Sequence, residues 1–509
     1  MKKTLGRIIG ILAFIIIVLY PVDPSAFPVE AKYAAAVTAL MIVWWVTEAI
    51  PIQATALIPI VLFPLLGVLT PAEACSAYGD KVIFLFMGGF IIAMSMQRWG
   101  LHERIALHII RKTGSSPRRL ILGFMIATAF LSMWISNTAT AMMMIPIAIA
   151  IIATILPNIE TKLEEMDPKQ RNFSECIVIS IAYAATIGGM ATIIGTPPNG
   201  FFIAQMQAIF PAAPPIDFST WMLFALPLSC VFLPIGWLWL TYGAYRDLPG
   251  KISAGKDIIE EKISALGAMS KGEKWTLLVF AGTAVAWILR SQKNIGDIVI
   301  PGINTFLPGV DDSTIAIAGA ILLFLLPVSR SEGIYTMNWE WAKKIPWGIL
   351  ILFGGGICLS KAFIASGLAN EIIERLGFIH TIHIVIAVLI VAILVSLLTE
   401  VTSNTAIAGV MMPIMAITAV SMEVHPYILM LTATFACSMA FMLPVATPPN
   451  AVAYGSGYIN IKDMIKAGWV LNIIGIILLV IFMFTVFMWV LGFGVEMPAW
   501  AFEPVISGG

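Results

Sequence analysis

Charge is scarce in this chain. Only 11% of its 509 residues are Asp, Glu, Lys or Arg, whereas soluble proteins carry about 25%. The 29 Lys and Arg balance the 29 Asp and Glu, so no basic excess indicates nucleic-acid binding. Because 59% of the residues are hydrophobic, the composition predicts a polytopic membrane protein, and long apolar runs make it all-α.

Paired cysteines and clustered histidines are missing too. The five cysteines stand singly in apolar stretches without a CxxC spacing, which excludes a disulfide framework and a zinc site. Histidine is absent from residues 120–156, 174–210, 384–421 and 426–458, the segments that hold the motifs described below. A membrane-embedded enzyme would need a metal cluster or a nucleophile–base pair there, so we expect a protein that is not an enzyme.

Apolar segments predict eleven transmembrane helices. The first is residues 1–22, and the others lie near 34–48, 53–69, 82–97, 174–210, 221–243, 275–289, 313–328, 346–360, 426–458 and 467–491. With the N-terminus in the cytoplasm, 23 of the 29 Lys and Arg fall in inside segments, as the positive-inside rule requires. This topology puts the C-terminus outside and suits a multi-pass protein of a bacterial inner (plasma) membrane.

The chain contains two halves that share a register. Ser136-Asn137-Thr138 recurs 267 residues later as Ser403-Asn404-Thr405, and Thr196-Pro197-Pro198-Asn199 recurs 251 residues later as Thr447-Pro448-Pro449-Asn450. We therefore expect an N-terminal helix with an outer loop (1–33), a first repeat (34–245), a cytoplasmic linker (246–274), a second repeat (275–491) and a C-terminal tail (492–509). By the count of crossings the repeats are inverted, which is typical of secondary transporters.

The segment 118–156 is too long for one crossing. About 37 apolar residues in one helix would measure roughly 55 Å, against ~30 Å for the hydrocarbon core. Basic residues flank both ends, so we expect a re-entrant hairpin with Ser136-Asn137-Thr138 at its tip. Residues 383–422 repeat the pattern from the outside. Ser, Asn and Thr cap helix N-termini, so each tip directs N–H groups and partial positive charge to the membrane centre, where one tip suits each end of a dianion.

The two Thr-Pro-Pro-Asn motifs interrupt apolar helices. Two prolines remove backbone donors and break the segments 173–210 and 426–458, which leaves carbonyl oxygens that can bind a small cation. No Lys or Arg occurs between 120 and 161, 172 and 245, or 376 and 461, so co-bound cations would compensate a dianion. Ser132 and Thr399 are candidate cation ligands; their alternative is a hydrogen bond to the carbonyl four residues back.

The paired motifs, together with Trp44-Trp45-Val46-Thr47-Glu48-Ala49-Ile50-Pro51 and Leu398-Thr399-Glu400-Val401-Thr402-Ser403-Asn404-Thr405, resemble the divalent anion:sodium symporter family over about residues 34–490. The resemblance implies a homodimer with a fixed scaffold and an elevator-type transport domain. It implies substrate carboxylates on the Asn and Thr of each tip, one Na⁺ site at Ser132, Asn137 and Gly195, and another at Thr399, Asn404 and Ala446. With the paired breaks included, the candidate substrate-binding residues are Ser136, Asn137, Thr138, Thr196, Pro198, Ser403, Asn404, Thr405, Thr447 and Pro448.

The expected function is import of C4-dicarboxylates such as succinate, fumarate and malate, coupled to co-transported Na⁺. A sodium-independent exchange of di- or tricarboxylates and a symport of sulfate-type dianions are the alternatives, because the same scaffold can serve both. Glu400 has Met133 at its register position in the first repeat. For this intramembrane carboxylate we expect a structural, hydrogen-bonded role rather than a proton relay.

Overall fold

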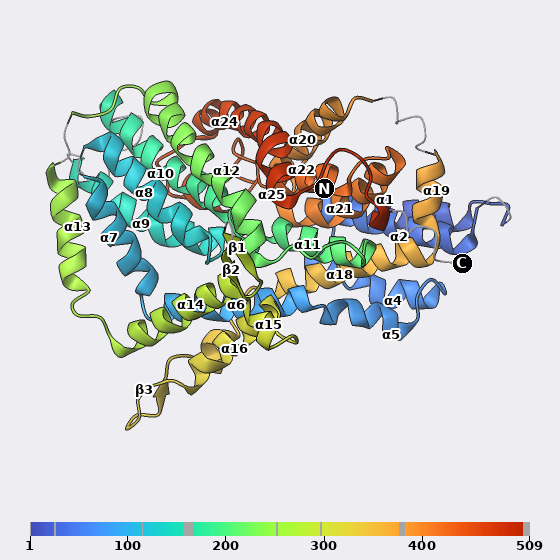
Figure 1. Ribbon diagram of the computed structural model, residues 1–509. Helices are drawn as coiled ribbons and strands as arrows, with labels where there is room; N and C mark the ends of the chain where they lie inside the picture. Colours follow the sequence, from blue (N-terminus) through green and yellow to red (C-terminus); the bar gives the residue numbers. More distant parts are fainter. Residues whose placement is uncertain are drawn as a thin grey trace.

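The computed structural model describes residues 2–24, 27–114, 116–155, 166–250, 253–295, 298–375 and 382–501. Figure 1 shows that these residues form a bundle of helices. Eight described helices are long and apolar enough to cross a membrane, and three shorter helices are apolar. The predicted all-α polytopic class is confirmed at this level.

The first half follows the predicted segments closely. It consists of α1 Lys2–Leu19, α2 Val29–Thr47, α3 Ile52–Thr55, α4 Ile58–Leu65, α5 Pro71–Ser76, α6 Lys81–Arg98, α7 Leu101–Thr113, α8 Pro117–Ser132, α9 Asn137–Ile155, α10 Pro168–Gly189, α11 Pro197–Ile209 and α12 Phe218–Leu238. A π-helical turn, Trp239–Ala244, extends α12. The apolar segment 53–69 is two short helices rather than one span, because Pro59 starts a new helix there.

The second half has the same order of helices. It consists of α14 Lys271–Leu289, α15 Ile303–Phe306, α16 Asp312–Leu325, α17 Trp339–Ala342, α18 Trp347–Ala365, α19 Leu368–Arg375, α20 Ile384–Val401, α21 Asn404–Ser421, α22 Pro426–Ala436, α23 Pro448–Gly455, α24 Ile461–Phe482 and α25 Met488–Leu491. The segment between the halves contains one further helix, α13 Ser253–Ala265.

Two short β-hairpins were not predicted. Strand β1 (Lys293–Ile295) pairs with β2 (Ile298–Ile300), and β3 (Pro327–Ser329) pairs with β4 (Ile334–Tyr335). Gly333, which has φ +64°, lies in the turn before β4, where a left-handed residue is needed. Two- and three-residue strands bury too little to leave a period-2 pattern that a sequence reading can detect.

The helices begin at positions that keep the two sequence offsets. Helix α9 begins at Asn137 and α21 at Asn404, while α11 begins at Pro197 and α23 at Pro448. The contacts follow the same scheme: α8 and α9 pack on α10 as α20 and α21 pack on α22, and the second half-helix of each break packs on the other half, α11 on α21 and α23 on α9. The two halves therefore fold alike and interlock at the breaks.

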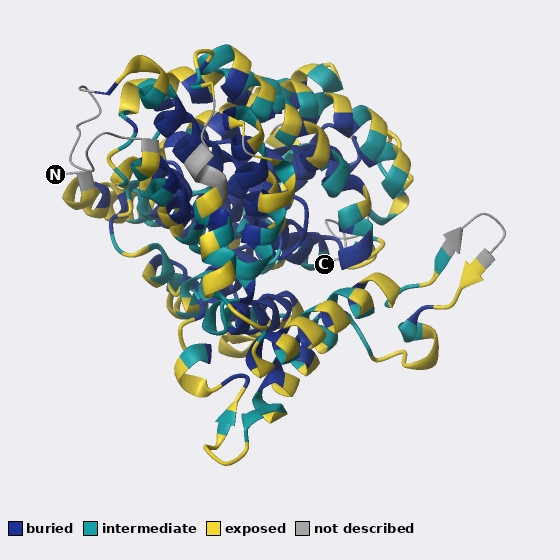
Figure 2. Ribbon diagram, turned by 90° about the vertical axis from the view of Figure 1, so that its left-hand side faces the viewer, coloured by how far each residue is buried: buried dark blue, intermediate teal, exposed yellow. Residues whose placement is uncertain are grey.

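Apolar side chains cover the outside of the bundle as well as its core. Figure 2 shows buried residues in the centre of the molecule and exposed ones along its periphery. On α20, Ile386, Ile390, Ile393 and Leu397 recur at helical spacing and are about half exposed. A soluble protein would not leave such a stripe in water, so this face fits contact with lipid.

Candidate functional site: two breaks and two helix tips

The first Ser-Asn-Thr tip lies between two helices. Helix α8 ends at Ser132, and α9 begins at Asn137. The Ser136 hydroxyl accepts a hydrogen bond of 3.4 Å from the backbone N–H of Ala139, which is the capping contact expected of this residue type. Ser136, Asn137 and Thr138 are partly exposed, although they lie between two apolar helices.

Oxygen atoms from three segments converge on the side chain of Asn137. One terminal atom of its amide lies 2.5 Å from Ser132 Oγ and 3.2 Å from the carbonyl oxygens of Ala185 and Gly195. With nitrogen at that position, the amide donates to all three. The structure thus brings together Ser132, Asn137 and Gly195, the three residues predicted for one Na⁺ site. Neutral hydroxyl, amide and carbonyl oxygens of this kind are suitable ligands for a small hard cation.

Two glycines permit this close approach. A Cβ on Gly189 would lie 2.5 Å from Asn137 Oδ1, and a Cβ on Gly195 would lie 2.4 Å from the carbonyl oxygen of Gly189. A larger residue at Gly189 would push the α10–α11 connection away from the α9 tip, and one at Gly195 would force that connection itself open. The glycines before the Pro-Pro pair therefore serve the packing of the tip, in addition to loosening the helix.

The second tip repeats the arrangement with different residues. Thr399, which is buried on α20, donates its hydroxyl to Asn404 Oδ1 and, at 3.0 Å, to the carbonyl oxygen of Cys437. Within the described part of the chain, neither the Ser132 nor the Thr399 hydroxyl donates a hydrogen bond to the carbonyl oxygen four residues back. Thr399 instead joins the tip to the second break. Ser403 and Thr405 are partly exposed, like their counterparts in the first tip. Ala446 is buried just before the second Pro-Pro pair, and its N–H donates to Leu443 O at 3.2 Å.

The asparagine of each Thr-Pro-Pro-Asn motif fixes the broken segment. Asn199 Nδ2 donates to the carbonyl oxygens of Gly189 at 3.2 Å and Thr192 at 2.7 Å. Asn450 Nδ2 donates to Ala440 O and Leu443 O, both at 3.1 Å, and these acceptors are 251 residues further along. Asn199 and Asn450 were not among the predicted site residues, although the repeated motif contains them. Each asparagine thus supplies donors to carbonyl groups of the segment that precedes its Pro-Pro pair.

The remaining residues of the motif differ between the halves. Thr196 and Thr447 are both buried, but only Thr447 caps its helix, by accepting from the N–H of Asn450 at 3.2 Å. Pro448 is exposed, whereas its counterpart in the first half, Pro197, is half-buried; Pro198 is buried. The two halves are thus alike in backbone and unlike in the environment of these side chains.

Glu400 stabilises the second break. Its carboxylate accepts from the N–H groups of Met442, at 3.0 and 3.1 Å, and Leu443, at 3.0 Å, and from Asn472 Nδ2 at 2.7 Å. Charged acceptors of backbone N–H groups form strong hydrogen bonds, so the expected hydrogen-bonded contacts of Glu400 are present. Asn472 on α24 was not predicted, because a single Asn in an apolar helix gives no motif to detect.

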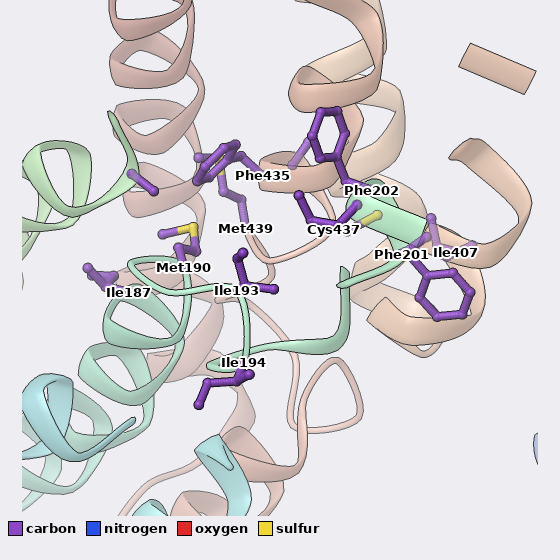
Figure 3. Close-up of a cluster of buried hydrophobic side chains, with 14 of the residues drawn as sticks. Ile187, Met190, Ile193, Ile194, Phe201, Phe202, Ile407, Phe435, Cys437 and Met439 are labelled. Carbon is purple, nitrogen blue, oxygen red and sulfur yellow. The ribbon is translucent and has the colours of Figure 1, made fainter. Parts of the chain in front are cut away.

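Apolar side chains enclose the breaks. Figure 3 shows Met190 and Ile193 of the first break in a cluster of buried side chains with Phe435 and Met439 from the second half, and Ile194 further along the same loop. All five are buried. The unwound backbone therefore lies inside protein, the only setting in which irregular backbone is tolerated at membrane depth unless it lines a cavity.

Comparison with known proteins places the chain in a family. The family profile described as the sodium:sulfate symporter transmembrane region matches residues 1–493. The chain belongs to this family. Two relatives named sodium-dependent dicarboxylate transporter SdcS are 42% identical to it: the Staphylococcus saprophyticus protein over 499 residues and a Staphylococcus aureus protein over 500, each match covering 97% of this chain and 93% of the relative. The predicted resemblance to divalent anion:sodium symporters is confirmed, and these relatives are transporters, not enzymes.

Two solved structures share the fold of this chain. One is the Alcanivorax borkumensis YdaH transporter, with a TM-score of 0.54 and 14% identity over 89% of this chain and 99% of that one. The other is Neisseria gonorrhoeae MtrF, with a TM-score of 0.57 and 12% identity over 95% and 94%. At such identities the likeness concerns the fold alone.

Proposed function

We propose that the chain is a secondary transporter that couples Na⁺ to the import of C4-dicarboxylates such as succinate, fumarate and malate. The observation that supports this best is the duplicated oxygen cluster, in which Ser132 meets Asn137 and Thr399 meets Asn404. The SdcS relatives, which are named sodium-dependent dicarboxylate transporters, support the choice of ion and substrate class.

Na⁺ binds at the two clusters. At the first, Ser132 Oγ and the carbonyl oxygens of Ala185 and Gly195 lie 2.5 to 3.2 Å from one terminal atom of the Asn137 amide. A cation there would require the Asn137 amide to present its oxygen, so Na⁺ binding and the orientation of this amide are coupled. At the second cluster, Thr399 and Asn404 supply the same two functional groups, and the backbone at Ala446 takes the place of Gly195.

The substrate lies between the two tips. Helices α9 and α21 begin at Asn137 and Asn404, and each N-terminus offers unpaired N–H groups and a partial positive charge. One carboxylate at each end, with Thr138 and Thr405 donating their hydroxyls, accounts for a molecule that carries two anionic groups. Because Asn137 and Asn404 belong to both the cation and the substrate sites, a bound Na⁺ prepares each tip for its carboxylate.

The membrane topology supports an inward-facing state. If the N-terminus is cytoplasmic and the repeats are inverted, α11 and α21 are the outer halves of their segments, and both pack on α18. This packing closes the outer route to the tips, whose Ser, Asn and Thr side chains are partly exposed. In the proposed elevator cycle of a homodimer, the hairpins and broken helices move as one body, and α11 and α21 release α18 when the site faces outward.

Uptake into proteoliposomes tests the proposal. Liposomes free of organic acid should accumulate labelled succinate under an inward Na⁺ gradient and not under an equal K⁺ gradient. Uptake that requires preloaded dicarboxylate and ignores the cation would instead establish exchange and remove the Na⁺ sites. Competition by sulfate rather than by fumarate would identify an inorganic dianion carrier, an alternative kept open by the sulfate in the family's description.

A further inference from the structure

A large groove lies apart from the breaks and tips. It has a volume of about 820 Å³ and lies between the start of α14 and the β3–β4 hairpin. Lys271, Lys274 and Trp275 line its α14 side, and Val328 and Arg330 line its hairpin side. In Figure 1 this hairpin projects from the lower edge of the molecule, beyond α14 and α16.

The groove is cationic. All three of its basic residues are exposed, and no carboxylate lines it. Within the described parts of the chain, none of Lys271, Lys274 and Arg330 forms an ion pair. Three unpaired cations around one cavity favour an anionic occupant.

The two lysines lie where a helix disfavours them. Lys271 and Lys274 occupy the first turn of α14, and the partial positive charge of a helix N-terminus repels cations. The acidic residue of that turn, Glu273, is engaged by Arg104 at 2.6 Å and by the backbone N–H of Ser270 at 2.7 Å, and in the described structure it forms no ion pair with either lysine. A bound anion would relieve the repulsion by contacting the lysines beside the helix N-terminus.

One wall of the groove is apolar. Leu278 is 60% exposed one turn further along α14, and Trp275 and Pro327 lie beside it. Tryptophan is enriched where a membrane meets water, and the rest of α14 is apolar. The groove therefore has basic side chains next to an apolar surface. This combination suits an anionic lipid better than a free anion.

We propose that this groove binds an anionic phospholipid, such as phosphatidylglycerol, from the leaflet on the cytoplasmic side. Lys271, Lys274 and Arg330 contact the phosphate, and an acyl chain lies along Trp275 and Leu278. This site depends on the sidedness of the chain but not on the nature of the transported substrate, so it can be right or wrong independently of the dicarboxylate proposal.

Native mass spectrometry of the purified full-length protein tests the site. Phosphatidylglycerol and phosphatidylcholine are titrated separately against wild type and the variant K271Q/K274Q/R330Q. Because each basic residue near an anionic lipid contributes substantially to attraction, the variant should bind phosphatidylglycerol at least about tenfold more weakly, with phosphatidylcholine binding unchanged.

A charge-matched variant serves as the control. K112Q/R119Q/K169Q also removes three exposed cations without a recorded ion pair, in segments assigned to the cytoplasm, and it should bind within about twofold of wild type. If both variants bind phosphatidylglycerol equally weakly, the loss reflects a general attraction between basic residues and anionic lipid, and the proposed site is overturned. Unchanged binding in the groove variant would overturn it too, and displacement of the lipid by millimolar inorganic phosphate would make it a free-anion site.

Discussion

Replacement of Gly189 by alanine should separate the first Ser-Asn-Thr tip from the break between α10 and α11 and weaken Na⁺ binding there. The added Cβ would lie 2.5 Å from Asn137 Oδ1, about 1 Å closer than the 3.4 Å at which ordinary contact begins. Asn137 must therefore retreat from Ser132 Oγ and from the carbonyl oxygens of Ala185 and Gly195. Overpacking costs about 1–3 kcal/mol, which, if all of it is lost from Na⁺ binding, corresponds to a loss of Na⁺ affinity of about five- to 150-fold.

The assay is the Na⁺ dependence of the initial rate of succinate uptake into proteoliposomes. G189A should raise the half-saturating Na⁺ concentration at least about fivefold. Gly282→Ala is the matched control, because Gly282 lies on an exposed part of α14 and a Cβ there meets nothing within 4 Å. A G189A variant with the half-saturating concentration of wild type would refute the assignment of Asn137 to a cation site.

Three further changes test other parts of the structure. Glu400→Gln replaces an acceptor by a donor opposite Met442 and should lower the free energy of unfolding by about 1–3 kcal/mol; an unchanged thermal unfolding temperature would contradict this. His425 caps α22 by accepting from the backbone N–H of Tyr427 at 3.2 Å. Burial lowers the pKa of this histidine to about 4, so between that pH and about 6.5 the unfolded chain binds a proton that the folded chain does not. Stability should therefore fall by up to about 3 kcal/mol as the pH falls through this window, and His425→Asn, which keeps an N-cap acceptor, should flatten the profile; parallel profiles would be inconsistent with this. Ser132→Ala and Thr399→Ala should each weaken Na⁺ activation of uptake, whereas a Thr399→Ser variant should retain it; full Na⁺ activation in either Ala variant would count against that cation site.

The sequence alone predicted the backbone of the site and part of its chemistry. The repeated tripeptide located the start of α9 and of α21, because Asn and Ser cap helices and the surrounding runs are too long for single crossings. The resemblance supplied the grouping of Ser132 with Gly195, two residues that are distant in the chain. Asn472 escaped prediction because its partner, Glu400, comes from another helix and no local spacing links them.

Other differences arise from tertiary contacts that local patterns do not encode. Thr196 and Thr447 occupy equivalent positions, yet only Thr447 caps its helix. The repeated motifs also did not predict that α18 packs on α11 and α21. That contact depends on how the two halves are positioned relative to each other, not on how each half folds. Sequence symmetry therefore predicts what the halves share, and the structure is needed to show where they differ.

The most direct test of the central claim is succinate uptake by Asn137→Ala and Asn404→Ala, measured separately under an inward Na⁺ gradient. Each asparagine is proposed to bind both Na⁺ and one substrate carboxylate, and its counterpart cannot replace it because it serves the other end of the molecule. Both variants should insert in the membrane, resist thermal unfolding as wild type does, and show no Na⁺-dependent uptake. If either single variant transports succinate at the wild-type rate, the two tips do not form the binding site.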